Sequence, residues 1–89
     1  MKKGQKDYWE RYREIGQQVA YYRKHGQMTQ EELAEKLDVS RQHIAAIEAP
    51  NVNRKISTDL LFDIAYLLKI EPKCLLEHQK ILLPETEDS

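Results

Sequence analysis

Apolar side chains recur every three or four residues along most of the chain. This spacing runs through residues 7–25 and returns at 33–37, 44–47 and 61–68. Because an α-helix turns once in 3.6 residues, such spacing gathers the apolar side chains on one helical face. A short fifth helix is predicted to begin at Pro72, since proline is common at the first position of a helix. The pattern therefore predicts an all-α domain.

The apolar faces of these helices define the predicted core. Its members are Ile15, Val19, Tyr22, Leu33, Ala34, Leu37, Val39, Ile44, Ile47, Leu61, Ile64, Ala65, Leu68 and Leu75. The chain has more apolar side chains than a core of this size can bury. Exposed apolar surface of this kind usually marks an interface, so we expect a homodimer. The additional side chains are Tyr8, Trp9, Tyr12, Phe62, Tyr66 and Ile81 to Leu83. The first three can instead pack against the C-terminal segment, and both interpretations are open.

Polar residues at the helix ends indicate most of the boundaries. Thr29 and Glu32 form a capping box, in which the hydroxyl accepts a bond from one free backbone amide and the carboxylate from another. Ser40 and Ser57 can cap the helices that follow them. Asp38 tolerates the left-handed backbone of a tight turn, so the short helices on its two sides are predicted to be joined there.

The first, long helix is predicted to end at Gly26. Glycine adopts positive φ without steric cost, and it commonly stands just past the last turn of a helix. The two short helices that follow cannot bury enough apolar surface to be stable alone. They need the first helix and the later ones as a scaffold.

Four short motifs follow one another along the chain. They are I-G-x-x-V-x-x-x-R (Ile15–Arg23), M-T-Q-E-E-L-A (Met28–Ala34), V-S-R-x-x-I-x-x-I-E (Val39–Glu48) and L-x-x-I-A-x-x-L (Leu61–Leu68). Together they resemble the Cro/phage-repressor type of helix-turn-helix DNA-binding domain, the XRE-like regulators, over roughly two-thirds of the chain. The resemblance implies five helices in a phage-repressor-like domain, with the helix-turn-helix at the second and third helices and the third helix reading the major groove.

The resemblance also implies roles for single residues. Residues at the positions of Arg23 and Glu48 commonly pair across the first and third helices of the family, so a structural ion pair is implied here. The position of Gln30 typically holds a DNA phosphate, where the free amides of a helix N-terminus add to the contact. The family more often has its glycine at the position of Gln27 than at that of Gly26.

The helix at 41–48 has an outer face suited to bases. With Ile44 and Ile47 turned inward, 100° per residue leaves the other side chains facing outward or to the flanks. Glutamine can bond an adenine edge and arginine a guanine edge through two atoms, and alanine can touch a thymine methyl. The predicted base-reading residues are Arg41, Gln42, Ala45 and Ala46, with Ala49 also pointing outward. The predicted phosphate-binding residues, which set position rather than sequence, are Gln30, Ser40, His43, Arg54 and Lys55.

These patterns divide the chain into three parts. Residues 1–14 are a basic and aromatic N-terminal extension of the first helix, residues 15–76 are the helix-turn-helix domain, and residues 77–89 hold a C-terminal apolar segment and an acidic tail. The tail, Glu85 to Ser89, is predicted to lack a fixed structure because it is acidic and has no apolar side chain.

Composition agrees with a small intracellular domain. The 89 residues are 40% apolar, which suits one globular unit. The single Cys74 excludes an internal disulfide and fits a reducing cytoplasm. No apolar run follows Met1, so no signal peptide or membrane anchor is expected.

The net charge of −1 is unusual for a DNA-binding chain, and on charge alone a balanced soluble surface is the simpler interpretation. The distribution of charge is uneven, however. Residues 1–27 carry seven Lys/Arg against three Asp/Glu, and residues 49–58 carry two basic side chains and no acid. Residues 28–48 and 59–89 are acidic. Basic charge therefore gathers at the first helix and in the loop after the helix pair.

The sequence predicts a transcriptional regulator that binds double-stranded DNA, with a second interpretation open. Ala45 and Ala46 stand where family members often have polar or basic side chains, so this face could also dock on protein. The alternative is thus a protein-interaction module on the same fold, such as an antitoxin or a modulatory subunit. Cys74 and His78 lie four residues apart, but a structural zinc site needs four ligands and no companion pair is present. No motif predicts an enzyme, a cofactor or a small-molecule ligand.

Overall fold

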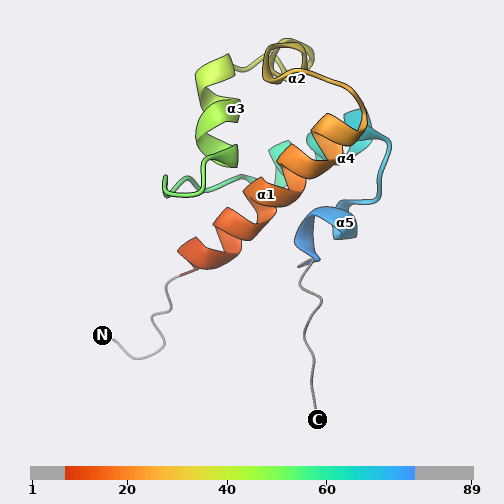
Figure 1. Cartoon of the computed structure of the whole chain (residues 1–89). Helices are drawn as coiled ribbons and strands as arrows, with labels where there is room; N and C mark the ends of the chain where they lie inside the picture. The colour runs from red at the N-terminus through yellow and green to blue at the C-terminus, as the bar shows by residue number, and fades with distance from the viewer. Residues whose placement is uncertain (1–7, 78–89) are drawn as a thin grey trace, which may run out of the picture.

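The computed structural model describes residues 8–77, which contain five α-helices and the segments that join them (Figure 1). The helices are α1 (Trp9–His25), α2 (Gln30–Leu37), α3 (Arg41–Glu48), α4 (Thr58–Leu68) and α5 (Pro72–Leu76). No strand occurs within these residues, so the all-α prediction is confirmed. The apolar run Ile81–Leu83, the acidic tail and His78 lie outside the described residues.

The predicted caps are present at the starts of three helices. At α2 the Thr29 hydroxyl accepts a hydrogen bond from the Glu32 amide at 3.0 Å, and the Glu32 carboxylate accepts one from the Thr29 amide at 2.8 Å. Ser40 caps α3 through the His43 amide, at 3.0 Å, and Ser57 caps α4. These bonds satisfy amides that a helix start otherwise leaves free.

The ends of α1, α2 and α4 share one motif. In each, a non-glycine residue adopts a left-handed conformation, namely Gln27 (φ 59°), Asp38 (φ 60°) and Lys69 (φ 61°). The amide of the next residue then bonds a carbonyl five positions back, as Val39 does to Ala34 at 3.0 Å. This is the Schellman arrangement, in which the residue after the left-handed one is often apolar. That residue is Met28, Val39 or Ile70, and all three pack against the core.

Helix α1 ends at Gly26 as predicted, but Gly26 does not take the positive φ that glycine allows. Its φ is −84°, and the left-handed residue is Gln27, one position later. The Schellman bonds explain the difference, because Met28 bonds the Arg23 carbonyl and Gln27 bonds that of Lys24. The left-handed residue must lie directly before the amide that reaches back five positions. The backbone pattern therefore selects Gln27, although glycine adopts this conformation at less cost.

The core lies where α1, α2, α3, α4 and α5 converge. The buried apolar side chains are Val19, Leu33, Ala34, Ile44, Ile47, Leu61, Ile64, Ala65 and Leu75. All belong to the predicted core, and the other predicted members are half-buried and pack against it. The sequence pattern missed a further group of half-buried contacts, namely Met28, Ile56, Leu60, Leu67 and Ile70.

Helix α1 is the scaffold on which the helix pair rests. It crosses the middle of the molecule and packs against α3, α4 and α5, while α2 packs against α3 and α4 (Figure 1). Gly16 lies against the backbone of α3, where an added Cβ would be 1.9 Å from the Ile47 carbonyl oxygen. Glycine is required here because the two helix backbones approach too closely for any side chain.

A hydrogen bond from the middle of α1 ties this helix to α5. The buried Gln18 amide donates a hydrogen bond to the Cys74 carbonyl at 3.0 Å. Burial raises the pKa of the Tyr22 phenol above its ordinary value, and the nearby Cys74 adds to the shift. Among residues 8–77, no helix has the length and apolar character needed to cross a membrane.

Candidate nucleic-acid interface

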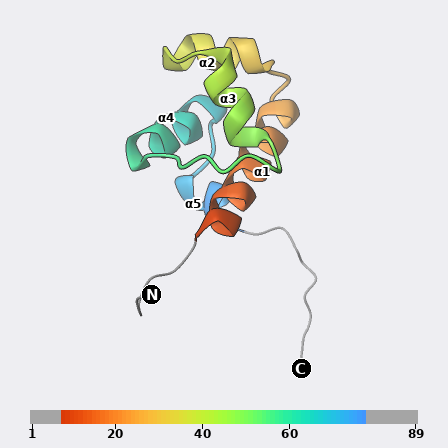
Figure 2. The ribbon, with the colours of Figure 1, turned by 90° about the vertical axis from the view of Figure 1, so that its left-hand side faces the viewer.

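Helix α3 and the loop after it lie on one face of the molecule (Figure 2). The inner side of α3 is fixed by Ile44, which is fully buried, and by Ile47, which is 4% exposed. Arg41 and Gln42 are exposed on the outer side, and Ala45 and Ala46 are half-exposed. The predicted base-reading residues thus lie together on the part of α3 that does not face the core.

A bidentate ion pair fixes α3 against α1. Arg23 Nε lies 2.7 Å from Glu48 Oε2, and Arg23 Nη2 lies 2.9 Å from Glu48 Oε1. The two side chains are only 8% and 6% exposed. Arg23 Nη1 also donates to the Met28 carbonyl at 2.7 Å, which ties in the turn before α2. Such an arrangement contributes mainly to geometry, because the cost of removing both charges from water offsets most of their attraction.

The ion pair continues through Gln30 to the face of α3. Gln30 Nε2 donates to Glu48 Oε1 at 3.0 Å, and Gln30 Oε1 accepts from Arg41 Nη1 at 3.2 Å. The sequence assigned Gln30 to a phosphate and Arg41 to a base, and did not anticipate this contact between them. A chain of hydrogen bonds therefore links Arg23 on α1 to Arg41 on α3, and it orients both predicted DNA-contacting side chains.

The basic loop after α3 is held from two sides. Arg54 Nη1 lies 2.7 Å from His43 Nδ1, which attaches the loop to α3. Lys55 Nζ lies 5.8 Å from the centre of the Trp9 ring, within the range of a cation–π contact. Arg13 of α1 also bonds the Asn53 side chain. The loop that carries Arg54 and Lys55 is thus supported by both α1 and α3.

The N-terminal aromatic residues take part in this support. Trp9 packs against Tyr12 with ring centres 5.9 Å apart, and it also faces Lys55. Tyr8 is 58% exposed and stands just before α1, so it does not continue the apolar stripe inward. Sequence reasoning missed the contact between Trp9 and Lys55. The available signal was an aromatic extension in a chain with a basic loop, which does not reveal their proximity.

The remaining predicted phosphate residue is Ser40. Its hydroxyl accepts the His43 amide as the N-cap of α3 and so lies at the start of the candidate reading helix. Within residues 8–77 no three side chains of the His, Cys, Asp or Glu type gather as metal ligands. Cys74 is half-buried, and His78, four residues later in the sequence, lies outside this range.

Helices α2 and α3 are short and are joined by a turn with a left-handed residue. The outer side of α3 is exposed, and its inner side is held against α1. This arrangement defines a helix-turn-helix domain. A family model described as Helix-turn-helix matches residues 19–73. This match covers more than half of the chain. Comparison with the curated proteins gives no match.

Solved structures of regulators are similar to this chain. SinR, the master regulator for biofilm formation from Bacillus subtilis, solved in complex with DNA, is 32% identical, with a TM-score of 0.64 over 71% of this chain and 98% of that one. The restriction-modification controller protein C.AhdI from Aeromonas hydrophila is 26% identical, with a TM-score of 0.65 over 72% and 94%. The hypothetical transcription factor NHTF from Neisseria, 19% identical with a TM-score of 0.72 over 90% of each chain, shares the fold.

The chain belongs to the helix-turn-helix family, in its XRE-like class of DNA-binding transcriptional regulators. The resemblance that the four sequence motifs indicated is confirmed, as is the position of the helix-turn-helix at α2 and α3. The matched residues fall within the domain predicted at 15–76.

Proposed function

We propose that this chain regulates transcription by binding a specific DNA sequence as a homodimer, with α3 in the major groove. The observation that carries the proposal is the joint placement of α3 and the basic loop on one face, both held by contacts to α1. SinR, a relative with 32% identity, has been solved in complex with DNA. A binding role, without catalysis, accounts for the site, and DNA as the target implies a cytoplasmic location.

Base reading is assigned to the outer side of α3. Gln42 is exposed and can bond an adenine edge, and Arg41 can reach a guanine from its position beside Gln30. The half-exposed Ala45 and Ala46 offer methyl contacts instead of hydrogen bonds. With few base hydrogen bonds available, part of the specificity is assigned to DNA shape.

Phosphate binding is assigned to the rim of this face. Gln30 and Ser40 lie at the N-termini of α2 and α3, where the free amides and the positive end of the helix favour an anion. His43, Arg54 and Lys55 lie along α3 and its following loop. These contacts set the position of the protein on the duplex.

Gln42→Ala is expected to reduce discrimination at one base pair by about 1–3 kcal/mol, and to leave binding to random DNA nearly unchanged. Gln42 is the long exposed polar side chain at the centre of the proposed reading face. The measurement is the affinity for a selected site, its single-base variants and random DNA. If all sequences weaken equally, or none does, this face of α3 does not read bases.

Lys55→Ala is expected to have the opposite effect, because a phosphate contact is blind to sequence. It should weaken every site similarly and reduce the slope of log affinity against log salt by about one unit per protomer. Lys73→Ala on α5 is the matched control, since α5 lies away from α3 (Figure 1). If Lys55→Ala leaves the salt slope unchanged, Lys55 does not contact a DNA phosphate.

The proposed dimer face is an apolar groove between α1, α4 and α5. It has a volume of about 270 Å³ and is lined by Tyr12, Ile15, Ile56, Ser57, Thr58, Leu61, Phe62 and Leu76. Phe62 and Leu76 are 50% and 60% exposed, although both are large apolar side chains. A second copy related by a two-fold axis would cover both and would present two α3 helices for half-sites about one DNA turn apart.

Light scattering at tens of micromolar is expected to give the mass of a dimer. Phe62→Glu should give a monomer, because a charge in a buried interface loses its hydration without a partner. The sequence also assigned Tyr66 to the interface, but Tyr66 lies outside this groove and is 82% exposed, so Tyr66→Glu is the matched control and should leave the dimer intact. A monomer mass for the unmodified chain, with and without DNA, would overturn the dimer.

A protein-interaction module is the second candidate function. The observation that favours it is the low polarity of the α3 face at Ala45 and Ala46, both half-exposed. It predicts no affinity for duplex DNA at any salt concentration. DNA binding that depends on sequence and weakens steeply with salt excludes it as the main role.

A further inference from the structure

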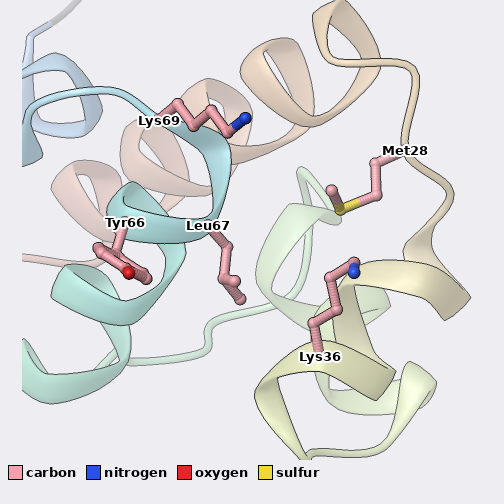
Figure 3. Close-up of a pocket in the computed structure, with 5 residues that line it drawn as sticks. All are labelled: Met28, Lys36, Tyr66, Leu67 and Lys69. Carbon is pink, nitrogen blue, oxygen red and sulfur yellow. The ribbon is translucent and has the colours of Figure 1, made fainter.

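A second groove lies between α2 and the end of α4 (Figure 3). It shares no lining residue with the proposed dimer face. Its volume is about 480 Å³. Met28 enters it from the turn between α1 and α2, and Lys36 from α2. Tyr66, Leu67 and Lys69 line it from α4 and the residue that ends α4. None of these side chains belongs to the proposed DNA-contacting residues.

This groove combines an apolar floor with a basic rim. Met28 and Leu67 provide the floor and are half-buried against the core. Lys36 and Lys69 are exposed, and neither forms an ion pair within residues 8–77. The lining of this groove contains no Asp or Glu, whereas Asp63 lines the adjoining groove together with Lys36. Two cations beside an uncovered apolar surface favour an occupant that is both apolar and acidic.

We propose that residues 81–89 of the same chain dock in this groove. The segment begins with Ile81, Leu82 and Leu83, and the acids Glu85, Glu87 and Asp88 follow within five residues. Its apolar part matches Met28 and Leu67, and its acidic part matches the two lysines. Pro84 separates the two parts and favours extended backbone on the residue before it.

The length of the chain allows docking within one molecule. From Lys69 to Glu77 the path consists of a short connection and the five-residue α5, so the two residues are at most about 20 Å apart. An extended chain spans about 3.3–3.6 Å per residue. Glu85 is eight residues after Glu77 and can therefore reach about 26–29 Å, beyond the distance to Lys69.

Charge distinguishes this groove from the one between α1, α4 and α5. The α1–α4–α5 groove could accept three apolar side chains, but its lining contains no Lys or Arg. The acids that follow Leu83 would have no basic partner in that lining. The α2–α4 groove supplies both kinds of contact, and Tyr66 at its edge is 82% exposed and available to cover the apolar part.

The test is paramagnetic relaxation in the full chain, with a spin label attached at Thr86→Cys in a Cys74→Ser background. The label is expected to broaden the amide resonances of Lys36, Leu67 and Lys69, and to leave those of Tyr12 and Ile56 sharp. The broadening should weaken at high salt, because salt screens the charged contacts. A mixture of isotope-labelled unmodified chain with spin-labelled, isotope-free chain should show none.

Charge reversal provides the matched control. Lys36→Glu with Lys69→Glu should lower the docking equilibrium, and hence the broadening, about three- to fivefold or more. Lys24→Glu with Lys73→Glu changes the net charge equally and should preserve the broadening. Adding Glu85→Lys and Glu87→Lys to the first double variant should restore it.

Three results would overturn the proposal. The first is no broadening in the α2–α4 groove, and the second is broadening of Tyr12 and Ile56 instead. The third is broadening in the mixed sample, which would show that the segment docks on another molecule. None of these results depends on DNA binding, so they leave the proposed function to its own tests.

Discussion

Glu48→Ala is expected to lower the free energy of unfolding by about 3–5 kcal/mol, because it leaves Arg23 buried and unpaired. Arg23 is 7% exposed and makes two of its hydrogen bonds to the Glu48 carboxylate. Gln30 loses its partner in the same change. Urea denaturation followed by circular dichroism measures the effect. A loss below about 1 kcal/mol would show that the pair is solvated rather than buried.

A double variant separates stability from geometry. Arg23→Met with Glu48→Leu removes both charges, so no buried charge is left without a partner. Replacement of a buried ion pair by apolar residues is often neutral or stabilising, and most of the stability should therefore return. If the pair serves to orient α3, this variant should be stable but should bind DNA more weakly than the unmodified chain. Full recovery of DNA affinity would contradict that role.

Gly16→Ala is expected to cost about 3 kcal/mol or more, near the upper end for added volume in a packed core. The new Cβ would lie 1.9 Å from the Ile47 carbonyl oxygen and 2.9 Å from its carbonyl carbon. These are backbone atoms, so α1 and α3 must separate to make room. The same denaturation measurement applies, and the displaced α3 should also weaken DNA binding.

Gly26→Ala is the matched control for this variant. Gly26 has a φ of −84°, and an added Cβ would be 3.4 Å from the Tyr22 carbonyl oxygen, which is ordinary contact. Its stability should stay within about 1 kcal/mol of the unmodified chain. Equal losses at Gly16 and Gly26 would mean that close approach of the helices is not the reason for glycine at Gly16.

Local signals in the sequence predict most of the fold. Apolar spacing identifies the buried positions, and the side chains of Thr29, Ser40 and Ser57 mark helix starts, because both effects act within a few residues. The end of α1 is the exception. Residue preference alone favours Gly26 for the left-handed position, whereas a hydrogen bond from Met28 to Arg23 assigns it to Gln27.

The contacts that orient the candidate interface could be predicted only in part. The resemblance implied the pair between Arg23 and Glu48, but not its continuation through Gln30 to Arg41. Nothing in the pattern places Trp9 beside Lys55, since 46 positions separate them in sequence. Such contacts depend on the packing of α1 against the rest of the domain, which local periodicity does not encode.

The contacts of single residues with DNA stay predictions. The structure gathers Arg41, Gln42 and the basic loop on one face, but the assignment of each side chain to a base or a phosphate comes from chemistry and from the resemblance. The prediction of a homodimer has the same standing. Both depend on one claim, that α3 reads a two-fold symmetric DNA site.

Selection of bound sequences from a random DNA pool tests that claim most directly. We expect enrichment of one sequence with two-fold symmetry, whose half-site centres are about 10–10.5 base pairs apart. Single-base changes in either half-site should cost about 1–3 kcal/mol of affinity. A pool that stays random after repeated selection, with equal affinity for selected and unselected DNA, would show that α3 does not read a specific DNA sequence.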